Sequence, residues 1–255
     1  MTLRVAVIGA RGRIGSEAVK AVEAAPDLEL VAALGRDSDL EELTRAGVQV
    51  AVELTHPDSV MRNLDFCVHS GIHVVTGTTG WDDVRLAELE HWLYPAEATG
   101  RPPLPVGVLI APNFSIGAVL GMKFAQTAAK YFETVEVVEL HHDRKADAPS
   151  GTATRTAQLI AAARAQAGLP AQQDPTTHGL PGARGADVDG VPVHSVRLRG
   201  LLAHQQVMFG DTGETLTIRH DSLHHSSFMP GILLGVRKVV ETPGLTLGLE
   251  HFLDL

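Results

Sequence analysis

The chain is poor in cysteine and in aromatic residues, and both shortages narrow its class. Cys67 is its single cysteine, which excludes an internal disulfide and a cysteine zinc site. Aromatic residues make up 4% of the chain, so we expect a core of Val, Leu, Ile and Ala. The N-terminus lacks the apolar core of a signal peptide, and no uncharged apolar run approaches the roughly 18 residues of a membrane helix. We therefore expect a cytoplasmic protein without a membrane partner.

Positive charge is also scarce. Lys and Arg number 21 against 30 Asp and Glu, which gives a net charge of −9 at pH 7. Such a chain repels nucleic acid at long range, so we expect no nucleic-acid partner, and an anionic metabolite needs a local positive pocket. The hydrophobic fraction of 44% excludes wholesale disorder, and the 255 residues suit one large domain or two small ones.

The first 112 residues alternate short apolar runs with helical patterns. Continuous apolar strands of this kind are typical of a parallel sheet covered on both faces. The alternation predicts an α/β fold with a Rossmann-type doubly wound parallel sheet, whose ligands bind at the carboxyl ends of the strands. The expected strands are residues 3–8, 28–34, 48–54, 72–76 and 106–110, and the expected helices begin near residues 13, 57 and 82.

The pattern changes character beyond residue 112. Residues 113–221 predict a second, α+β domain with a mixed, antiparallel-leaning sheet, and residues 222–255 predict a helix that returns to the first domain. That helix is expected over 228–240, with Ser226 or Ser227 as its cap. Other expected elements are helices at 117–132 and 153–167, strands at 134–140, 192–198, 202–209 and 214–220, and a loop over 171–190.

Three glycines, Gly9, Gly12 and Gly15, follow the first expected strand and open the first expected helix. Glycines at these positions let the backbone approach a pyrophosphate, which then lies on the free N–H groups at the helix N-terminus. The G-x-x-G-x-x-G spacing differs from the commonest fingerprint, and a tight turn without a ligand is the alternative. The surrounding strand and helix favour dinucleotide binding.

The second expected strand ends at Gly35 and Arg36, where an NAD-binding chain usually carries an acid for the ribose hydroxyls. The missing carboxylate removes repulsion toward a 2′-phosphate, and Arg36 can pair with one, aided by Arg11 and Arg13. We therefore expect NADPH to be preferred, with NADH possible. In the alternative, Asp37 reaches the ribose and Arg36 is solvated.

Two later strand ends carry small or polar residues that leave room for a nicotinamide and its ribose. They are Gly77-Thr78-Thr79-Gly80 and Ala111-Pro112-Asn113-Phe114. Each is weak evidence alone, because such loops are also common turns.

The segment from Glu139 to Ala153 gathers His141, His142 and Lys145 at the end of a strand, followed by Gly151 and Thr152 at the start of a helix. Helix N–H groups and an ammonium group together make a carboxylate site, which is the local positive pocket that the net charge requires. The alternative is that Ser150 or Thr152 only caps the helix and that the histidines are solvated.

A second histidine group comprises His220, His224 and His225 beside Asp221. Two histidines four residues apart can bind a metal from one helical face, but Ser226, Ser227 and Pro230 place that spacing in a loop. We expect no metal site. His56, His73 and Cys67 receive no functional role.

Residues 139–153 read E-L-H-H-x-x-K-x-D-A-P-S-G-T-A, and this motif resembles that of the dihydrodipicolinate reductase family, also called 4-hydroxy-tetrahydrodipicolinate reductase. The resemblance covers nearly the whole chain, including residues 9–15, 77–79, 111–117, 193–198 and 209–210. It implies reduction of a cyclic imine dicarboxylate by NAD(P)H in the diaminopimelate route of lysine biosynthesis. It also implies a homotetramer assembled through the sheet of the second domain.

The same resemblance implies roles for individual residues. His141 would donate or accept a proton and Lys145 would donate one, while His142, Gly151 and Thr152 would bind the substrate. The domains would be a dinucleotide-binding domain (1–112), a substrate-binding and oligomerisation domain (113–221) and the returning segment (222–255). The implied cofactor-binding residues are Gly9, Ala10, Arg11, Gly12, Arg13, Ile14, Gly35, Arg36, Gly77, Thr78, Thr79, Ala111, Pro112, Asn113 and Phe114.

The chain departs from the family pattern at four positions. Many NADH-using members carry an acid where Gly35 stands, which favours NADPH here. Glu53 stands where Asp is usual, and Gln206 and His225 replace a common Glu and Arg, which points to a missing structural charge pair. Two alternatives remain at this stage, namely another NADP-dependent reductase of a small carboxylate and a non-catalytic NADPH-sensing regulator.

Overall fold

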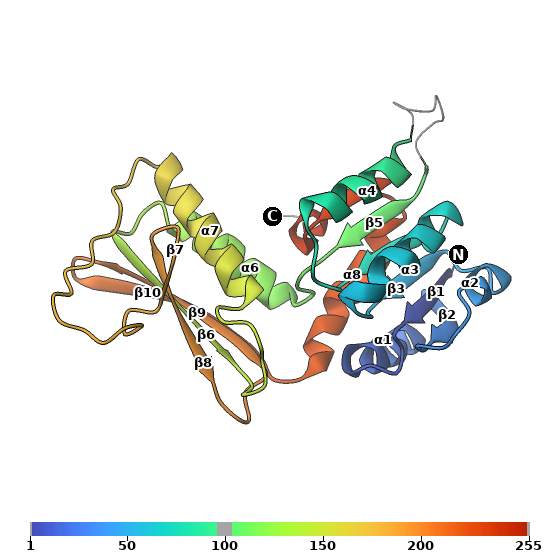
Figure 1. Ribbon diagram of the computed structural model, residues 1–255, viewed down its shortest axis with the longest axis horizontal. Helices are drawn as coiled ribbons and strands as arrows, with labels where there is room; N and C mark the ends of the chain where they lie inside the picture. The colour runs from blue at the N-terminus through green and yellow to red at the C-terminus, as the bar shows by residue number, and fades with distance from the viewer. Residues whose placement is uncertain (1, 96–103, 254–255) are drawn as a thin grey trace. The chain divides into compact units, whose positions relative to one another are not determined.

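The computed structural model describes residues 2–95 and 104–253 and divides into two compact units (Figure 1). The first unit holds the residues up to Ile116 and those from His225 onward, and the second holds Gly117–His224. The domain changes expected after residues 112 and 221 lie a few residues before these points. Within the described residues, the helices are too short or too polar to span a bilayer.

A six-stranded parallel sheet forms the centre of the first unit, in the order β11-β5-β4-β3-β1-β2. The strand order reverses at β1, which is where ligands bind in doubly wound sheets. The predicted Rossmann-type sheet is confirmed, but the sequence predicted only five of its strands. The strands are β1 (Leu3–Ile8), β2 (Leu28–Leu34), β3 (Val50–Glu53), β4 (His73–Thr76), β5 (Gly107–Ile110) and the unpredicted β11 (Gly244–Leu247).

Helices cover both faces of this sheet. Successive strand residues point to opposite sides, so a continuous apolar strand contributes buried side chains to a core on each face. On one face, Ala51 of β3 belongs to the same buried core as Leu64 of α3 and Leu89 of α4. On the other face, Gly235 of α8 lies so close to the sheet that a Cβ there would be 2.9 Å from Leu109. The helices of this unit are α1 (Arg13–Ala24), α2 (Glu41–Arg45), α3 (Pro57–His69), α4 (Asp83–Leu93), α8 (Met229–Val239) and the 3₁₀ helices η1 (His225–Phe228) and η2 (Leu249–Phe252).

The second unit contains a five-stranded sheet in the order β10-β9-β6-β8-β7. Only the β6–β8 pair among its described pairs is parallel, so the predicted mixed sheet is confirmed. Ala125 of α6 and Ile160 of α7 pack into a core with Val137, Val193 and Phe209 of the sheet. The elements are α6 (Ile116–Ala128), β6 (Thr134–His141), α7 (Gly151–Gln166), β7 (Ala186–Val188), β8 (Val191–Arg197), β9 (Ala203–Asp211) and β10 (Glu214–Ser222).

Two local predictions were wrong. The loop expected over 171–190 contains β7, a three-residue strand that pairs with β8 through a tight turn at Asp189 and Gly190. Neither Ser226 nor Ser227 caps α8, because both lie inside η1, which runs directly into α8 with Phe228 at the N-cap position. Elements this short carry too few residues to show a period in the sequence.

Candidate active site

The glycine loop brings the backbones of β1, α1 and the end of β3 unusually close together. A Cβ on Gly15 would lie 2.1 Å from the carbonyl oxygen of Gly9, and a Cβ on Gly9 would lie 2.5 Å from that of Leu54. Gly9 also has a φ of +89°, so only glycine fits at both positions. Gly12 is the N-cap residue of α1, and no side chain caps this helix. The first N–H groups of α1 can therefore receive a pyrophosphate.

The loop is held against the end of β2. The N–H groups of Gly9 and Ala10 donate to the carbonyl oxygen of Leu34 at 2.9 and 3.0 Å. Arg13 and Ile14 form the first turn of α1. The predicted pyrophosphate loop and the predicted ribose-binding strand end are thus neighbours.

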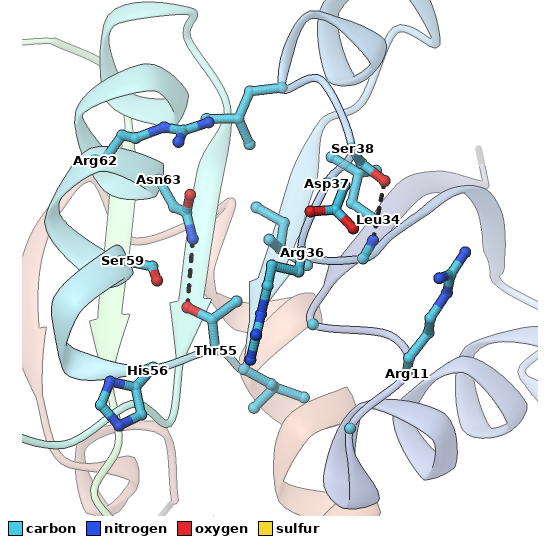
Figure 2. Close-up of a pocket in the computed structure, with 16 residues that line it drawn as sticks. Arg11, Leu34, Arg36, Asp37, Ser38, Thr55, His56, Ser59, Arg62 and Asn63 are labelled. Atoms are coloured by element: carbon cyan, nitrogen blue, oxygen red, sulfur yellow. Dashed lines mark hydrogen bonds between the residues drawn. The ribbon is translucent and has the colours of Figure 1, made fainter.

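A cavity of about 540 Å³ opens beside this loop (Figure 2). Three guanidinium groups line it, those of Arg11 in the glycine loop, Arg36 in the loop after β2, and Arg62 on α3. Gly9, Gly12 and Gly35 line it too. Three cationic side chains beside an uncapped helix N-terminus fit a dinucleotide that carries an additional phosphate.

Arg11 lies beside the position that a side chain at Gly35 would occupy. A Cβ on Gly35 would lie 3.4 Å from Nε of Arg11, so the guanidinium packs over the position where an NAD-binding chain carries an acid. Asp37 lines the same cavity and stays available as a ribose partner.

The sequence missed one wall of the cavity, which comes from the end of β3 and from α3. His56, to which we assigned no role, lines the cavity and is also the N-cap residue of α3, accepting the N–H of Asp58 at 3.4 Å. The signal was present, because the carboxyl end of every strand in such a sheet is a candidate ligand position. The missed lining residues are Thr55, His56, Ser59, Arg62 and Asn63.

The two loops expected to receive the nicotinamide lie side by side. The N–H of Ala111 donates to the carbonyl oxygen of Thr76 at 2.9 Å, and a Cβ on Gly77 would lie 2.6 Å from the ring of Phe114. Thr78 is buried, and its hydroxyl donates to Glu53 at 2.7 Å. The segments Gly77–Thr79 and Ala111–Phe114 do not line the cavity shown in Figure 2, which is formed by other parts of the expected cofactor site.

In the second unit, a buried carboxylate orients His141. Glu139 is fully buried on β6, and its Oε2 lies 2.5 Å from Nδ1 of His141. Burial would raise the pKa of Glu139, but hydrogen bonds from His141, Arg197 and Ser195 outweigh it and lower the pKa to about 2. The ionised carboxylate accepts a hydrogen bond from Nδ1–H of the ring, so Nε2 is the ring nitrogen that can exchange a proton with a ligand.

Arg197 holds the same carboxylate from β8. Its Nη1 and Nη2 donate to Oε2 and Oε1 of Glu139 at 2.9 and 2.7 Å, and Nη2 also donates to the carbonyl oxygen of Asp147 at 2.7 Å. The N–H of Ser150 donates to Oε1 of Glu139 at 3.2 Å. Glu139 and Arg197 therefore fix the far end of the loop that carries His142 and Lys145. The sequence alone indicated no role for Glu139 or Arg197.

Lys145 is paired within its own loop. Its Nζ donates to Oδ1 of Asp147 at 2.7 Å, and its backbone N–H donates to the carbonyl oxygen of His142 at 3.2 Å. Burial would raise the pKa of Asp147, but bonds from Lys145 and from the N–H of Gly151 lower it. The carboxylate of Asp147 thus contacts two of the groups expected to bind a substrate carboxylate.

Helix α7 begins at Gly151, directly after this loop. Ser150 is its cap, with a hydroxyl that accepts the N–H of Ala153 at 3.2 Å, as the alternative interpretation expected. A Cβ on Gly151 would meet nothing within 4 Å, so there is open space beside the helix start. Capping by Ser150 is compatible with a ligand there, because one cap satisfies one of several N-terminal N–H groups.

The second histidine group has no metal-binding arrangement in the part of the chain that the structure describes. Asp221 is engaged by Arg219 at 2.9 Å and by His204 at 2.7 Å, and the latter histidine was not part of the predicted group.

Comparison with known protein families gives matches over nearly the full length of the chain. Residues 3–114 match the family model described as "Dihydrodipicolinate reductase, N-terminus", and residues 117–253 match the model "Dihydrodipicolinate reductase, C-terminus". The chain belongs to the dihydrodipicolinate reductase family. The recognition made from residues 139–153 is confirmed, and the protein is an NAD(P)H-dependent oxidoreductase.

Individual relatives of the dihydrodipicolinate reductase family match equally completely. The 4-hydroxy-tetrahydrodipicolinate reductase of Streptomyces griseus is 75% identical over 99% of this chain and 98% of its own length, and that of Nocardia farcinica is 61% identical over 100% of both. A dipicolinate-bound dihydrodipicolinate reductase from Paenisporosarcina sp. TG-14 superposes with a TM-score of 0.84 at 40% identity, covering 99% of this chain and 100% of the other. An amine dehydrogenase from Mycobacterium smegmatis shares the fold alone, with a TM-score of 0.61 at 11% identity over 96% and 95% of the two chains.

Proposed function

We propose that this protein reduces 4-hydroxy-tetrahydrodipicolinate, through dihydrodipicolinate, to tetrahydrodipicolinate in the diaminopimelate route of lysine biosynthesis. The observation that carries this proposal is the arrangement of residues 139–152 around one buried carboxylate, with His141 oriented by Glu139 and Lys145 four residues further on. Known proteins support the proposal too, because this chain is 56–75% identical over nearly its full length to relatives named 4-hydroxy-tetrahydrodipicolinate reductase.

The substrate is a cyclic imine dicarboxylate, and the charges of the second unit suit it. His142, Gly151 and Thr152 bind its carboxylate and ring, in a region where the helix N-terminus of α7 supplies partial positive charge. Lys145 donates the proton that the ring requires after reduction, and His141 relays or supplies it through Nε2. Asp147 leaves the Lys145 ammonium when the substrate carboxylate takes its place.

The first unit holds the dinucleotide, which supplies a hydride when bound. Gly9 to Ile14 bind the pyrophosphate at the N-terminus of α1. Arg11 and Arg36 pair with a 2′-phosphate, which makes NADPH the preferred cofactor and leaves NADH usable. The nicotinamide and its ribose lie along Gly77–Thr79 and Ala111–Phe114, where a Cβ on Gly77 would clash with the ring of Phe114 at 2.6 Å.

The test generates the substrate in place from pyruvate and aspartate semialdehyde with the preceding synthase, then follows NADPH oxidation by absorbance. We expect oxidation that depends on this protein and on both substrates, with a lower KM for NADPH than for NADH. NADPH binding without oxidation would instead indicate the regulator, and oxidation only with unrelated carboxylates would indicate a different reductase.

We also propose a cytoplasmic homotetramer assembled through the sheet of the second unit. Strand β10 supports this assembly, because it is a nine-residue edge strand with mostly exposed residues, including a half-exposed Leu216. Light scattering after size-exclusion chromatography should give four times the mass of the 27.1 kDa chain. A monomer at micromolar concentration would contradict the assembly without affecting the proposed reaction.

A further inference from the structure

Glu53 is a fully buried carboxylate at the end of β3. Both of its oxygens accept hydrogen bonds, and each oxygen serves a different segment. Oε2 accepts the hydroxyls of Thr76 at 2.9 Å and Thr78 at 2.7 Å, from the end of β4 and the loop that follows. Oε1 accepts the amide of Asn63 on α3 at 3.1 Å and the hydroxyl of Thr55.

These four donors are all neutral, and among the described contacts of Glu53 there is no Lys, Arg or His. A buried carboxylate without a counter-ion is costly unless several donors stabilise it, and here the donors are arranged on both sides of the group. Glu53 therefore accepts hydrogen bonds at both oxygens and holds a donor group on each side.

The partners of Glu53 belong to two different parts of the expected cofactor site. Thr55 and Asn63 line the cavity that also contains Arg36 (Figure 2). Thr78 lies in the loop expected to receive the nicotinamide. Two hydrogen bonds hold this residue, one from its hydroxyl to Glu53 at 2.7 Å and one from its N–H to the Thr76 hydroxyl at 3.2 Å. One carboxylate joins the two segments.

We propose that Glu53 is a positioning residue for the cofactor, which sets the loop of residues 77–79 through Oε2 and the cavity wall of Thr55 and Asn63 through Oε1. This inference rests on the proposed function. It predicts that loss of carboxylate acceptor positions weakens binding of both halves of NADPH, whereas loss of one donor on the Oε2 side weakens binding of the nicotinamide half alone.

The test compares Glu53→Gln and Thr78→Val, with dissociation constants measured by calorimetry for NADPH and for adenosine 2′,5′-bisphosphate, which lacks the nicotinamide. Glu53→Gln keeps the size of the side chain but removes two acceptor positions. We expect it to raise the Kd for NADPH about tenfold and that for the bisphosphate to a smaller extent. Thr78→Val should raise the Kd for NADPH and leave that for the bisphosphate unchanged. Glu29→Gln, at an exposed ion pair with Arg4, is the matched control and should change neither.

A folded Glu53→Gln protein with wild-type affinity for both ligands would overturn the proposal, and so would a Thr78→Val protein with wild-type affinity for NADPH. If Glu53→Gln does not fold, as circular dichroism would show, Thr78→Val decides alone. Failure of the proposed function has a different signature, because the wild-type protein would then bind NADPH yet oxidise none of it with the substrate.

Discussion

Nδ1 of His141 lies 2.5 Å from Oε2 of Glu139, a carboxylate that the side chain of Arg197 holds at both oxygens. The pair resembles the base and orienting acid of other proton-transfer sites, in which the acid fixes the tautomer and direction of the ring. His141 and Lys145 thus have different supports, because the ion pair of Lys145 among the described residues is with a half-exposed Asp147.

Replacement of Glu139 by Gln should lower kcat by about 10- to 100-fold, because the ring of His141 loses its charged partner and its preferred tautomer. The pH profile of kcat should change as well, since the neutral amide of the glutamine cannot stabilise a protonated His141 ring as the carboxylate does. Glu136→Gln is a matched control on the same strand, where Glu136 pairs with His194 at 2.5 Å and with Arg184. Equal losses in the two variants would show that Glu139 acts only on the fold.

The acid stability of the protein should depend on Glu139. Its pKa of about 2 lies below the ordinary value of 4.5, so the unfolded chain binds a proton that the folded chain does not. Stability from this group is complete above pH 4.5 and is lost as the pH falls toward 2, with a slope of at most about 1.4 kcal/mol per pH unit. Urea unfolding over this range should show a shallower decline for Glu139→Gln than for the wild type. Parallel curves would contradict the assignment.

Lys145→Ala should lower kcat by about 10² or more, the usual contribution of a general acid, while NADPH still binds. Lys130→Ala removes an exposed lysine from the same unit and should leave kcat unchanged. Both variants can be compared in the coupled assay, with NADPH affinity measured separately. A near-wild-type kcat for Lys145→Ala would mean that the proton comes from another group.

Gly35→Glu should shift the cofactor preference toward NADH. The backbone at Gly35 is outside the left-handed region, and a side chain there starts 3.4 Å from Nε of Arg11. The new carboxylate would pair with Arg11, repel a 2′-phosphate and accept the ribose hydroxyls of NADH. We expect kcat/KM for NADPH to fall about tenfold and that for NADH to hold or rise. A uniform loss with both cofactors would show damage to the loop instead.

The sequence predicted those parts of the site that are local in the chain. The close approach of Gly15 to Gly9 joins residues six apart and follows the glycine spacing, whereas the approach of Gly9 to Leu54 is seen only in the structure. Glu139 and Arg197 are 58 residues apart, and they meet because β6 and β8 pair in parallel with His141 opposite Arg197. No local pattern shows that register. Strand β11 was missed for a related reason, because its four residues become a strand only beside β5.

The bond between Lys145 and Asp147 has a consequence for ligand choice. A carboxylate that arrives at Lys145 and Gly151 exchanges with one already present, so its net affinity is a difference between two similar interactions. A ligand with one carboxylate gains little from such an exchange. A ligand that brings a second anionic group gains the contacts of that group in full, so we expect the Lys145–Asp147 pair to make the site select dianions over monocarboxylates.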